Sequence, residues 1–359
     1  MESRNDYRRL PADEVRCVVA GVLEACEVPA EDAAVVAEVL VCADLRGIES
    51  HGVSRLIPYY VDGIRAGHLN PRARPSVQRS VGGLFAMDGD NGLGHVVGKA
   101  TMNRAIEGAW EHGIGMGAVG NSNHFGIAGY YSAMALEHGM IGFCLSNSRP
   151  LVMPTGSRKA VLGTNPLSIA IPAGRHAPLL LDMATSGVPI GKVEVKRRRG
   201  EKVPRGWGAD SSGRPTEDPA EIIGGGALFP LGGPRETAGY KGYGLGAVVD
   251  ILSGVLSGSS FLTSVLAGAD PGASGVGHFM GAMRVDPFCE PGEFAERMDR
   301  FIDELRGAPL AVGEEEILIA GDPERRLEEE NHRLGISLHR DVWNAIAELA
   351  SELGVEGVQ

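Results

Sequence analysis

The stretch GMGAVGNSNHFG, residues 115–126, decides how the rest of the chain is interpreted. Its first six residues match the GxGxxG pattern of dinucleotide-binding loops, which requires a strand, a tight turn and a helix in that order. Here the glycines fall inside the apolar, strand-like run itself. A second match, GYGLGA at residues 242–247, has no strand before it. We therefore interpret both sets of glycines as packing or turn positions and expect a fold other than the Rossmann fold.

The second half of the same stretch places His124 between a predicted strand and a predicted helix. Active sites of α/β proteins tend to lie at the carboxyl ends of strands. An imidazole titrates near neutral pH, so His124 is a candidate general acid and base, able to accept a hydroxyl proton and to return it. The alternative is a histidine that caps or packs the turn.

Short apolar runs separated by glycine surround this stretch and predict buried strands. Helical patterns lie among them, which makes the middle of the chain mixed α/β. The predicted strands are 83–87, 116–119, 141–145, 167–171 and 178–181, and the predicted helices of this region are 95–111, 126–138 and 243–257.

Both ends of the chain are predicted to be helical, because apolar residues recur there at spacings of three and four. We expect helices at 11–27, 29–46, 293–305 and 342–353, with a short strand at 317–320. The predicted organisation is a helical domain of residues 1–75 with 295–359, and an α/β domain of residues 76–294 that carries the cofactor and the chemistry.

Length and charge limit the classes of function. A chain of 359 residues is long enough for two domains. Its net charge of -12 disfavours binding to nucleic acids and to anionic membranes. The five cysteines form no CxxC pair, and no apolar stretch is long enough for a membrane span, so we expect reduced thiols and a cytoplasmic location. No HxxxH or HExxH pair occurs, and no metal site is predicted.

Arg55 and Tyr59 are four residues apart and would share one face of a helix that follows the second one. The planar guanidinium of Arg55 could bind a carboxylate through two parallel hydrogen bonds. The alternative is an exposed arginine paired with a surface acid.

Three further positions are candidates for ligand contact, each with a structural alternative. Thr164 lies in a small polar loop after Gly163, and Asp182 ends an apolar run where it could bind a ribose or cap a helix. Lys241 precedes the glycines of the second fingerprint and could meet cofactor phosphates, or lie free in solvent. The basic run 196–199 is interpreted as a solvated loop.

Taken together, several blocks resemble the malate/L-lactate dehydrogenase type 2 family, in order from about residue 36 to residue 353. These blocks are RGIESHGVSRL (46–56), DGDNGLG (88–94), NSNHFG (121–126), GTNPLS (163–168), DMATS (182–186), GWGAD (206–210), ALFPLGG (227–233) and KGYGLGAVVDILSGVLSG (241–258). The resemblance implies a homodimer, a non-Rossmann cofactor domain of the malate/L-sulfolactate dehydrogenase type, and a helical domain built from both chain ends.

The resemblance also implies roles for residues. His124 matches the catalytic acid and base of the family, and His51, Arg55 and Tyr59 match positions around the substrate and the nicotinamide. The positions that match contacts to NAD or NADP are Ser148, Asp182, Met183, Ala184, Lys241, Ala320, Gly321 and Asp322.

The sequence therefore predicts an NAD- or NADP-dependent oxidoreductase that interconverts a small 2-hydroxy acid and its 2-oxo acid, with His51 and Arg55 assisting His124 and Thr164 contacting the substrate. One alternative is a reductase of cyclic imines. A metabolite-binding protein without activity and a metal-dependent hydrolase are the alternatives from other classes.

Overall fold

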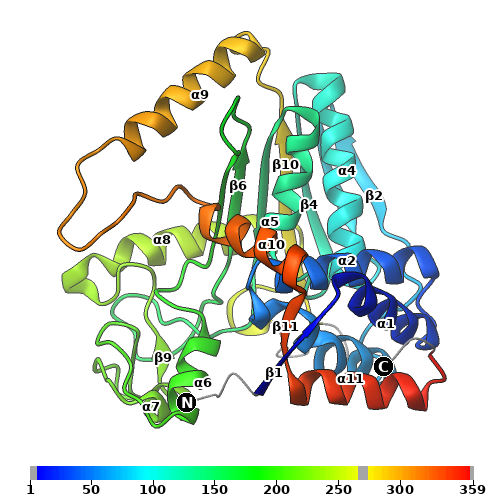
Figure 1. The fold of residues 1–359 in the computed structure, drawn as a ribbon, viewed down its shortest axis with the longest axis vertical. Coiled ribbons are helices and arrows are strands. Elements are labelled where there is room, and N and C mark those ends of the chain that lie inside the picture. The colour runs from blue at the N-terminus through cyan, green and yellow to red at the C-terminus, as the bar shows by residue number, and fades with distance from the viewer. Residues whose placement is uncertain (1–5, 266–273, 356–359) are drawn as a thin grey trace.

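A computed structural model describes residues 6–265 and 274–355, and its centre is a seven-stranded mixed sheet (Figure 1). Only β3 and β4 run parallel, and every other neighbouring pair is antiparallel. In spatial order the strands are β2 (Ser76–Val81), β3 (Leu84–Asp88), β4 (Ile114–Ser122), β10 (Val276–Met283), β5 (Ile141–Ser146), β6 (Leu167–Ile171) and β7 (Leu179–Met183).

This topology confirms the predicted mixed α/β, non-Rossmann fold, because a Rossmann sheet is mostly parallel. The GMGAVG fingerprint lies within β4, as predicted. The GYGLGA fingerprint lies inside helix α8 (Gly239–Asp250) and does not form a loop. Neither set of glycines therefore has the strand–turn–helix context of a phosphate-binding loop.

The glycines of β4 allow helix α4 (Gly94–His112) to lie close against the sheet. A Cβ atom on Gly115 would stand 1.9 Å from the carbonyl oxygen of Ala105 in that helix. This contact involves backbone on both sides, so it cannot be relieved by turning a side chain.

We expect Gly115→Ala to lower the free energy of unfolding by about 1–3 kcal/mol, because the added methyl group overpacks the contact between α4 and β4. Chemical denaturation measures the change. Gly191→Ala is the matched control, since a Cβ there meets no atom within 4 Å and the residue lies in helix α6 (Ile190–Arg198). Equal stability of the Gly115 variant and the wild type would contradict the packing role.

The strand at the centre of the sheet, β10, is not among the strands that the sequence predicts. It pairs antiparallel with both β4 and β5. Its sequence, VGHFMGAM, has no clear apolar alternation, and glycine and alanine at several positions weaken the strand signal. Its pairing depends on segments more than 100 residues away, which local patterns do not reveal.

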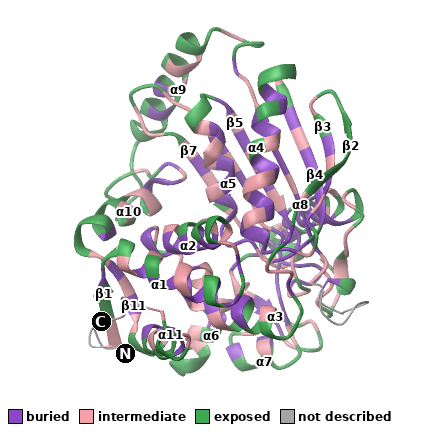
Figure 2. Cartoon of the chain, turned by 90° about the vertical axis from the view of Figure 1, so that its right-hand side faces the viewer, coloured by how far each residue is buried: buried purple, intermediate pink, exposed green. Residues whose placement is uncertain are grey.

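Two helical segments cover the inner part of the sheet and form its apolar core. These are α4 and α5 (Ala128–Met134), the latter continued by η5 (Ala135–His138). Fully buried members of this core include Val97, Met102 and Tyr131 from the helices and Val119 and Met280 from the strands. Figure 2 shows the buried faces of α4 and α5 turned toward the strands.

A second core joins the two ends of the chain. Helices α1 (Ala12–Ala25), α2 (Ala30–Leu45) and α11 (Arg340–Glu352) pack together beside the two-stranded sheet of β1 (Tyr7–Leu10) and β11 (Ile336–His339). Val18, Leu40 and Trp343 are each at most 1% exposed in this core. The predicted helices at both ends are confirmed, while the domain boundaries near residues 75 and 295 stay a prediction.

Helix α9 (Pro291–Arg306) lies against the turn between β6 and β7. The carboxylate of Asp299 accepts hydrogen bonds from the backbone N–H groups of Gly174, Arg175 and His176, at 2.8–3.2 Å. The strand predicted at 317–320 is wrong. This segment has no regular secondary structure; Leu180 N of β7 donates to Ala320 O at 2.9 Å, and the chain then leads into α10 (Asp322–Leu334).

A small lobe with its own apolar core lies below α8 in Figure 1. Its core includes Val152, Val193, Ile222 and Leu228. The prediction of a loop for the basic run 196–199 is wrong, because residues 196–198 form the last turn of α6, where cations complement the helix dipole. The other elements of the lobe are α7 (Pro219–Ile223), β8 (Gly208–Ala209) and β9 (Ala227–Leu228).

The remaining elements are short turns of helix. Among the residues that the structure describes, no helix combines the length and the apolar character that a membrane span requires. The short elements are η2 (Glu49–His51), η3 (Val53–Arg55), η4 (Leu56–Val61), α3 (Asp62–Arg65), η6 (Arg235–Thr237), η7 (Ile251–Val255) and η8 (Leu262–Ser264); η4 and η7 are π-helices.

Candidate active site

His124 lies just beyond the carboxyl end of β4, as the sequence predicts, and shortly before α5 begins at residue 128. The residue before it fixes this turn. The buried Asn123 donates through Nδ2 to the carbonyl oxygens of Asn91 and Gly92, and its Oδ1 accepts from the hydroxyl of Ser274 at 2.6 Å. The backbone at His124 is therefore held from two sides.

The structure brings His51, Tyr59 and Tyr60 around the imidazole of His124, although they are more than 60 residues away in the chain. The hydroxyl of Tyr60 lies 2.6 Å from His124 Nδ1. The ring of His51 stacks on that of His124 with centroids 5.5 Å apart, and the ring of Tyr59 meets it edge-on at 5.2 Å. His124 itself remains partly exposed.

Arg55 lies beside this cluster, and its two terminal guanidinium nitrogens are not engaged by a carboxylate of the described residues. Its Nε donates to the carbonyl oxygen of Ser50 at 2.6 Å, and its guanidinium carbon lies 4.9 Å from the centre of the Tyr59 ring. No carboxylate of the described residues forms an ion pair with it. The two terminal nitrogens therefore remain available for the carboxylate of a ligand.

Tyr60 is not predicted from the sequence, because its segment is not an α-helix. Arg55 and Tyr59 do meet, as their spacing of four predicts. Leu56–Val61, however, forms a π-helix, in which the turn is wider than that of an α-helix. This widening allows Tyr59 and Tyr60 both to reach His124. Pro58 is the signal that could have revealed it, since proline removes a backbone donor and disrupts the α-helical pattern.

A buried carboxyl group, that of Asp44, supports the turn that carries His51 and Arg55. It accepts a hydrogen bond from Val53 N at 2.8 Å, and it lies so close to Gly52 that a Cβ there would stand 1.9 Å from Asp44 Oδ1. Burial raises the pKa of Asp44 to about 8. No sequence pattern pointed to this residue.

The histidines of the cluster are uncharged at neutral pH. Burial, reinforced by the neighbouring His51, His95 and Arg55, lowers the pKa of His124 well below its usual value of 6.5. Burial and the charge of Arg55 lower the pKa of His51 to about 4. A neutral imidazole is the form that accepts a proton, so His124 is in the state that a general base requires.

Two more histidines lie behind the cluster, fully buried. His278 lies between two serine hydroxyls, with Ser122 Oγ 2.9 Å from Nε2 and Ser146 Oγ 2.8 Å from Nδ1. His95 packs edge-on to the ring of Tyr60 at 4.8 Å. Over residues 6–265 and 274–355, no group of three or more His, Cys, Asp or Glu side chains has the arrangement of a metal site.

Ser148 and Thr164 lie together next to the end of the sheet. Thr164 N donates to Ser148 Oγ at 3.0 Å, and the two hydroxyls are 3.2 Å apart. The buried Asn165 connects them to α8, because its Oδ1 accepts from Ser148 N and its Nδ2 donates to Gly246 O. Lys241, in the first turn of the same helix, is exposed.

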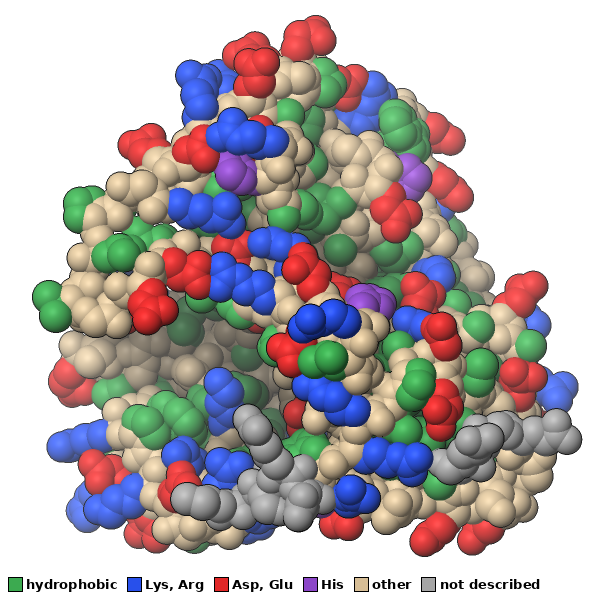
Figure 3. Space-filling model, viewed as in Figure 1, with side chains coloured by type: hydrophobic (Ala, Val, Ile, Leu, Met, Phe, Trp, Pro, Cys, Tyr) green, Lys and Arg blue, Asp and Glu red, His purple; other side chains and the backbone are tan. Residues whose placement is uncertain are grey.

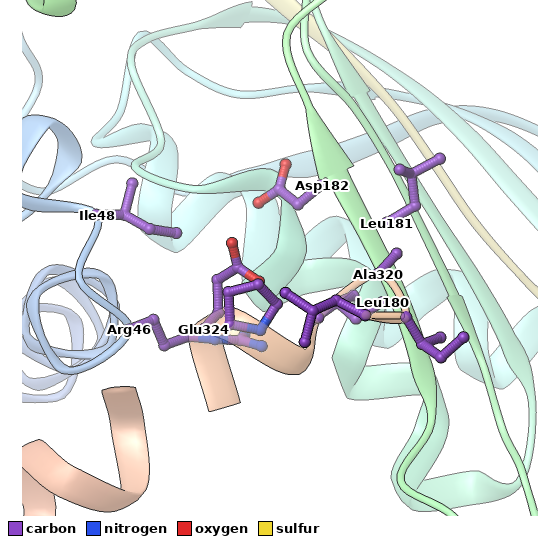
Figure 4. Close-up of a pocket in the computed structure, with 11 residues that line it drawn as sticks. Arg46, Ile48, Leu180, Leu181, Asp182, Ala320 and Glu324 are labelled. Carbon is purple, nitrogen blue, oxygen red and sulfur yellow. The ribbon is translucent and has the colours of Figure 1, made fainter. Parts of the chain in front are cut away.

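A pocket of about 270 Å³ contains three of the predicted cofactor residues, Asp182, Ala320 and Gly321 (Figure 4). Arg46 and Glu324 also line it, and its apolar wall includes Ile48, Leu180 and Ile319. Met183 and Ala184, which follow Asp182 at the end of β7, are not in its lining.

Asp182 connects the pocket to the region of His124. Its Oδ2 accepts a hydrogen bond from Gly129 N at 2.7 Å, in the first turn of the helix that follows His124. The interpretation of Asp182 as the cap of a following helix is wrong, because its carboxylate bonds to α5, which precedes β7 in the chain and has Ile127 at its N-cap. Its other oxygen is left for a ligand. On the opposite side, Arg46 and Ile48 precede His51 by only a few residues.

The carboxylate of Asp322 is engaged within the protein. It accepts hydrogen bonds from Ile319 N and from the guanidinium groups of Arg306 and Arg325, at 2.5–2.9 Å. Although burial raises its pKa, these hydrogen bonds lower the pKa of Asp322 to about 2. A ligand in the pocket can therefore meet this loop only through its backbone or through neighbouring side chains.

Comparison of the chain with known proteins identifies its family. The model of the malate/L-lactate dehydrogenase family matches residues 10–347. The chain belongs to the malate/L-lactate dehydrogenase family.

Individual members of the malate/L-lactate dehydrogenase family align over nearly their whole length. A malate dehydrogenase of Pyrococcus abyssi is 46% identical over 99% of this chain and 97% of its own. An L-sulfolactate dehydrogenase of Methanothermobacter thermautotrophicus is 37% identical over 96% and 97%. The solved structure of a malate dehydrogenase from Pyrococcus horikoshii superposes with a TM-score of 0.91 at 42% identity, covering 99% of both chains. The protein is therefore an oxidoreductase that acts on a hydroxy acid.

Proposed function

We propose that the protein uses NAD or NADP to transfer a hydride between the nicotinamide and C2 of a small 2-hydroxy or 2-oxo acid such as malate, lactate or sulfolactate. The observation that carries the proposal is the pairing of an uncharged, partly exposed His124 with an arginine whose terminal nitrogens have no carboxylate partner among the described residues. These are the two groups that a 2-hydroxy acid needs, a base for its hydroxyl and a cation for its carboxylate.

The proton is exchanged at Nε2 of His124, because the Tyr60 hydroxyl occupies Nδ1. For Nε2 to accept the substrate's hydroxyl proton, the neutral ring must carry its own proton on Nδ1, where it donates to Tyr60 Oη. In the opposite direction, the imidazolium returns the Nε2 proton to the keto oxygen. The Tyr60 hydroxyl can accept from Nδ1 or donate to it, so it holds the ring in place in either tautomer. The backbone N–H of Gly126 also points at Nδ1, at 3.4 Å.

The guanidinium of Arg55 binds the substrate carboxylate and fixes the position of C2 relative to His124. The stacked ring of His51 and the edge of Tyr59 close the other sides of this space and exclude water. Thr164 and Ser148, whose hydroxyls are 3.2 Å apart, are proposed to contact the substrate and the cofactor.

The residues of the 270 Å³ pocket fit the adenosine part of a dinucleotide. Asp182 and Glu324 offer carboxylate acceptors for ribose hydroxyls, and the apolar wall suits an adenine ring. The backbone of Gly321 lies close to Leu180. Its φ is +97°, and a Cβ atom at this position would stand 3.1 Å from the Leu180 side chain. Lys241 would contact the phosphates of the cofactor. Met183 and Ala184 would contact the part of the cofactor that lies between its phosphates and its nicotinamide.

We also propose a homodimer, formed through the exposed face of α8 and η7. Tyr240, Val248, Ile251 and Val255 recur along this face at helical spacing, and each is 50–53% exposed. Apolar stripes of this kind on a folded surface mark interaction sites. A second copy presents the same stripe and can bury both against each other about a two-fold axis.

We expect the double substitution Val248→Glu and Ile251→Glu to convert a dimer into monomers at micromolar protein concentration, because two buried like charges per chain would face each other across the axis. Light scattering after size-exclusion chromatography measures the mass. Val312→Glu is the control, since Val312 is exposed on another segment. An unchanged dimer mass in the double variant would exclude this face as the interface.

We expect Tyr60→Phe to lower kcat about two- to twelvefold, the equivalent of one lost hydrogen bond of about 0.5–1.5 kcal/mol. Loss of the acceptor also disfavours the imidazolium, so the acidic limb of kcat/KM for oxidation should move to lower pH. Tyr130→Phe removes a hydroxyl outside the site and should change neither quantity. A loss of activity in Tyr60→Phe without any shift of the pH profile would mean that Tyr60 has only a structural role.

The proposed function is tested with a panel of 2-hydroxy and 2-oxo acids and both cofactors, following the absorbance of the reduced nicotinamide. Turnover of at least one acid is expected. Reduction of a cyclic imine in place of every keto acid would make the protein an imine reductase. Cofactor binding without turnover of any compound would make it a binding protein.

A further inference from the structure

A groove of about 620 Å³ lies in the small lobe, and none of the residues that line it is among those predicted for the active site. One wall comes from residues 153–158, and the other comes from the segments around residues 205, 212–215 and 229–236. Its volume falls within the range of sites for small organic ligands.

Three arginines, Arg158, Arg205 and Arg235, line this groove and make no ion pair within the described residues. Glu236 is the one carboxylate among the lining residues, so the groove carries an excess of positive charge in a chain whose net charge is -12. Unpaired guanidinium groups that line a cavity attract anions.

Elsewhere on the described surface, a number of arginines pair with Asp or Glu. Arg9 pairs with Glu330 and Arg326 with Glu316. Figure 3 shows acidic and basic side chains interspersed over α9 and α10 on the face that it presents. Other arginines, such as Arg300, also make no ion pair within the described residues; what distinguishes Arg158, Arg205 and Arg235 is that all three line one groove.

The floor of the groove is apolar and one of its hydroxyl groups is unsatisfied. Met153 and Phe229 are buried beneath it, at 2% and 6% exposure. The hydroxyl of Thr155 in the wall is buried and has no hydrogen-bond partner within the described residues. A buried polar group of this kind is unfavourable, and an oxygen-rich ligand seated against the wall would relieve it.

We propose that this groove binds an organic phosphate, with its phosphoryl oxygens against Arg158, Arg205 and Arg235 and its apolar part over Met153 and Phe229. Guanidinium groups match phosphate oxygens in paired, charge-assisted hydrogen bonds, and three of them suit a doubly charged group better than a single carboxylate. The apolar floor distinguishes an organic phosphate from the inorganic ion. The site is separate from that of the dinucleotide.

Phenyl phosphate is the probe, titrated into the purified protein in a calorimeter with and without saturating reduced nicotinamide cofactor. We expect saturable binding that the cofactor does not weaken, and weaker binding of inorganic phosphate, which lacks the ring. The triple variant Arg158→Gln, Arg205→Gln, Arg235→Gln should bind phenyl phosphate at least about tenfold more weakly, since each charged hydrogen bond is worth that much or more. Arg300→Gln, which removes an exposed arginine of α9, should bind it as the wild type does.

Three outcomes would overturn the proposal. They are the absence of saturable binding at millimolar phenyl phosphate, equal binding by the triple variant, and competition with the nicotinamide cofactor, which would place the anion in the dinucleotide site. The turnover of hydroxy acids by wild-type protein is measured in parallel, so that a failure here is distinguished from a failure of the proposed function.

Discussion

His124→Ala is expected to lower kcat for oxidation of the 2-hydroxy acid by about 10²–10⁴-fold, the range that a positioned general base contributes. The uncharged imidazole at the end of β4 is the group placed to take the hydroxyl proton, and alanine leaves only water to do so. Binding of the reduced cofactor should change little, because the 270 Å³ pocket is lined by other residues. Stopped-flow turnover and cofactor fluorescence measure the two quantities.

His51→Ala is the matched comparison, since the two rings stack and burial lowers the pKa of both. In our proposal His51 shapes the site while His124 exchanges the proton, so His51→Ala should retain more activity and keep the acidic limb of the pH profile. If His51→Ala instead lost the most activity while His124→Ala kept turnover near that of the wild type, the roles of the two histidines would be exchanged.

The elements that sequence patterns predicted best are those whose signal is local. Helices α1 and α2 follow from apolar residues at spacings of three and four, and β4 from an apolar run bounded by glycines. The position of His124 at the end of β4 follows from the order of the two elements. None of these depends on knowing what lies across the sheet.

The features that were missed depend on partners distant in the chain or on unusual backbone. Strand β10 is stabilised by its pairing with β4 and β5, and the glycines in its sequence weaken the local strand signal. Tyr60 reaches His124 through a π-helix, whereas the prediction assumed the spacing of an α-helix. Asp44 is buried near the end of α2. Its role can be recognised only from the folded chain, in which Gly52 packs against its carboxyl group.

The spacing of residues along the sequence could not predict which of the site residues come together in space. His51 and His124 are 73 positions apart by number, and nothing in their local sequences indicates that their rings stack. Family resemblance proposed both as site residues, and the fold explains the contact, since the turn after α2 lies beside the carboxyl end of β4. The candidate active site therefore forms where the N-terminal helical part of the chain packs against the sheet.

Arg55→Gln is expected to lower kcat/KM for the hydroxy acid by about 10²–10³-fold, mainly through KM, because two charge-assisted hydrogen bonds to the substrate carboxylate would be lost. Arg55→Lys should recover only part of the loss, since an ammonium keeps the charge but cannot form the planar pair. Initial rates over a range of substrate concentrations separate the two parameters.

The structural effect of the same change must be distinguished from the binding effect, because Arg55 Nε also donates to Ser50 O beside His51. Glutamine and lysine both lose that geometry, so a purely structural role would reduce kcat similarly in the two variants and leave KM unchanged. A binding role instead ranks KM as wild type, then lysine, then glutamine. If KM for the acid stayed at the wild-type value in both variants, the carboxylate would have to be bound by a cation other than the guanidinium that lies over Tyr59.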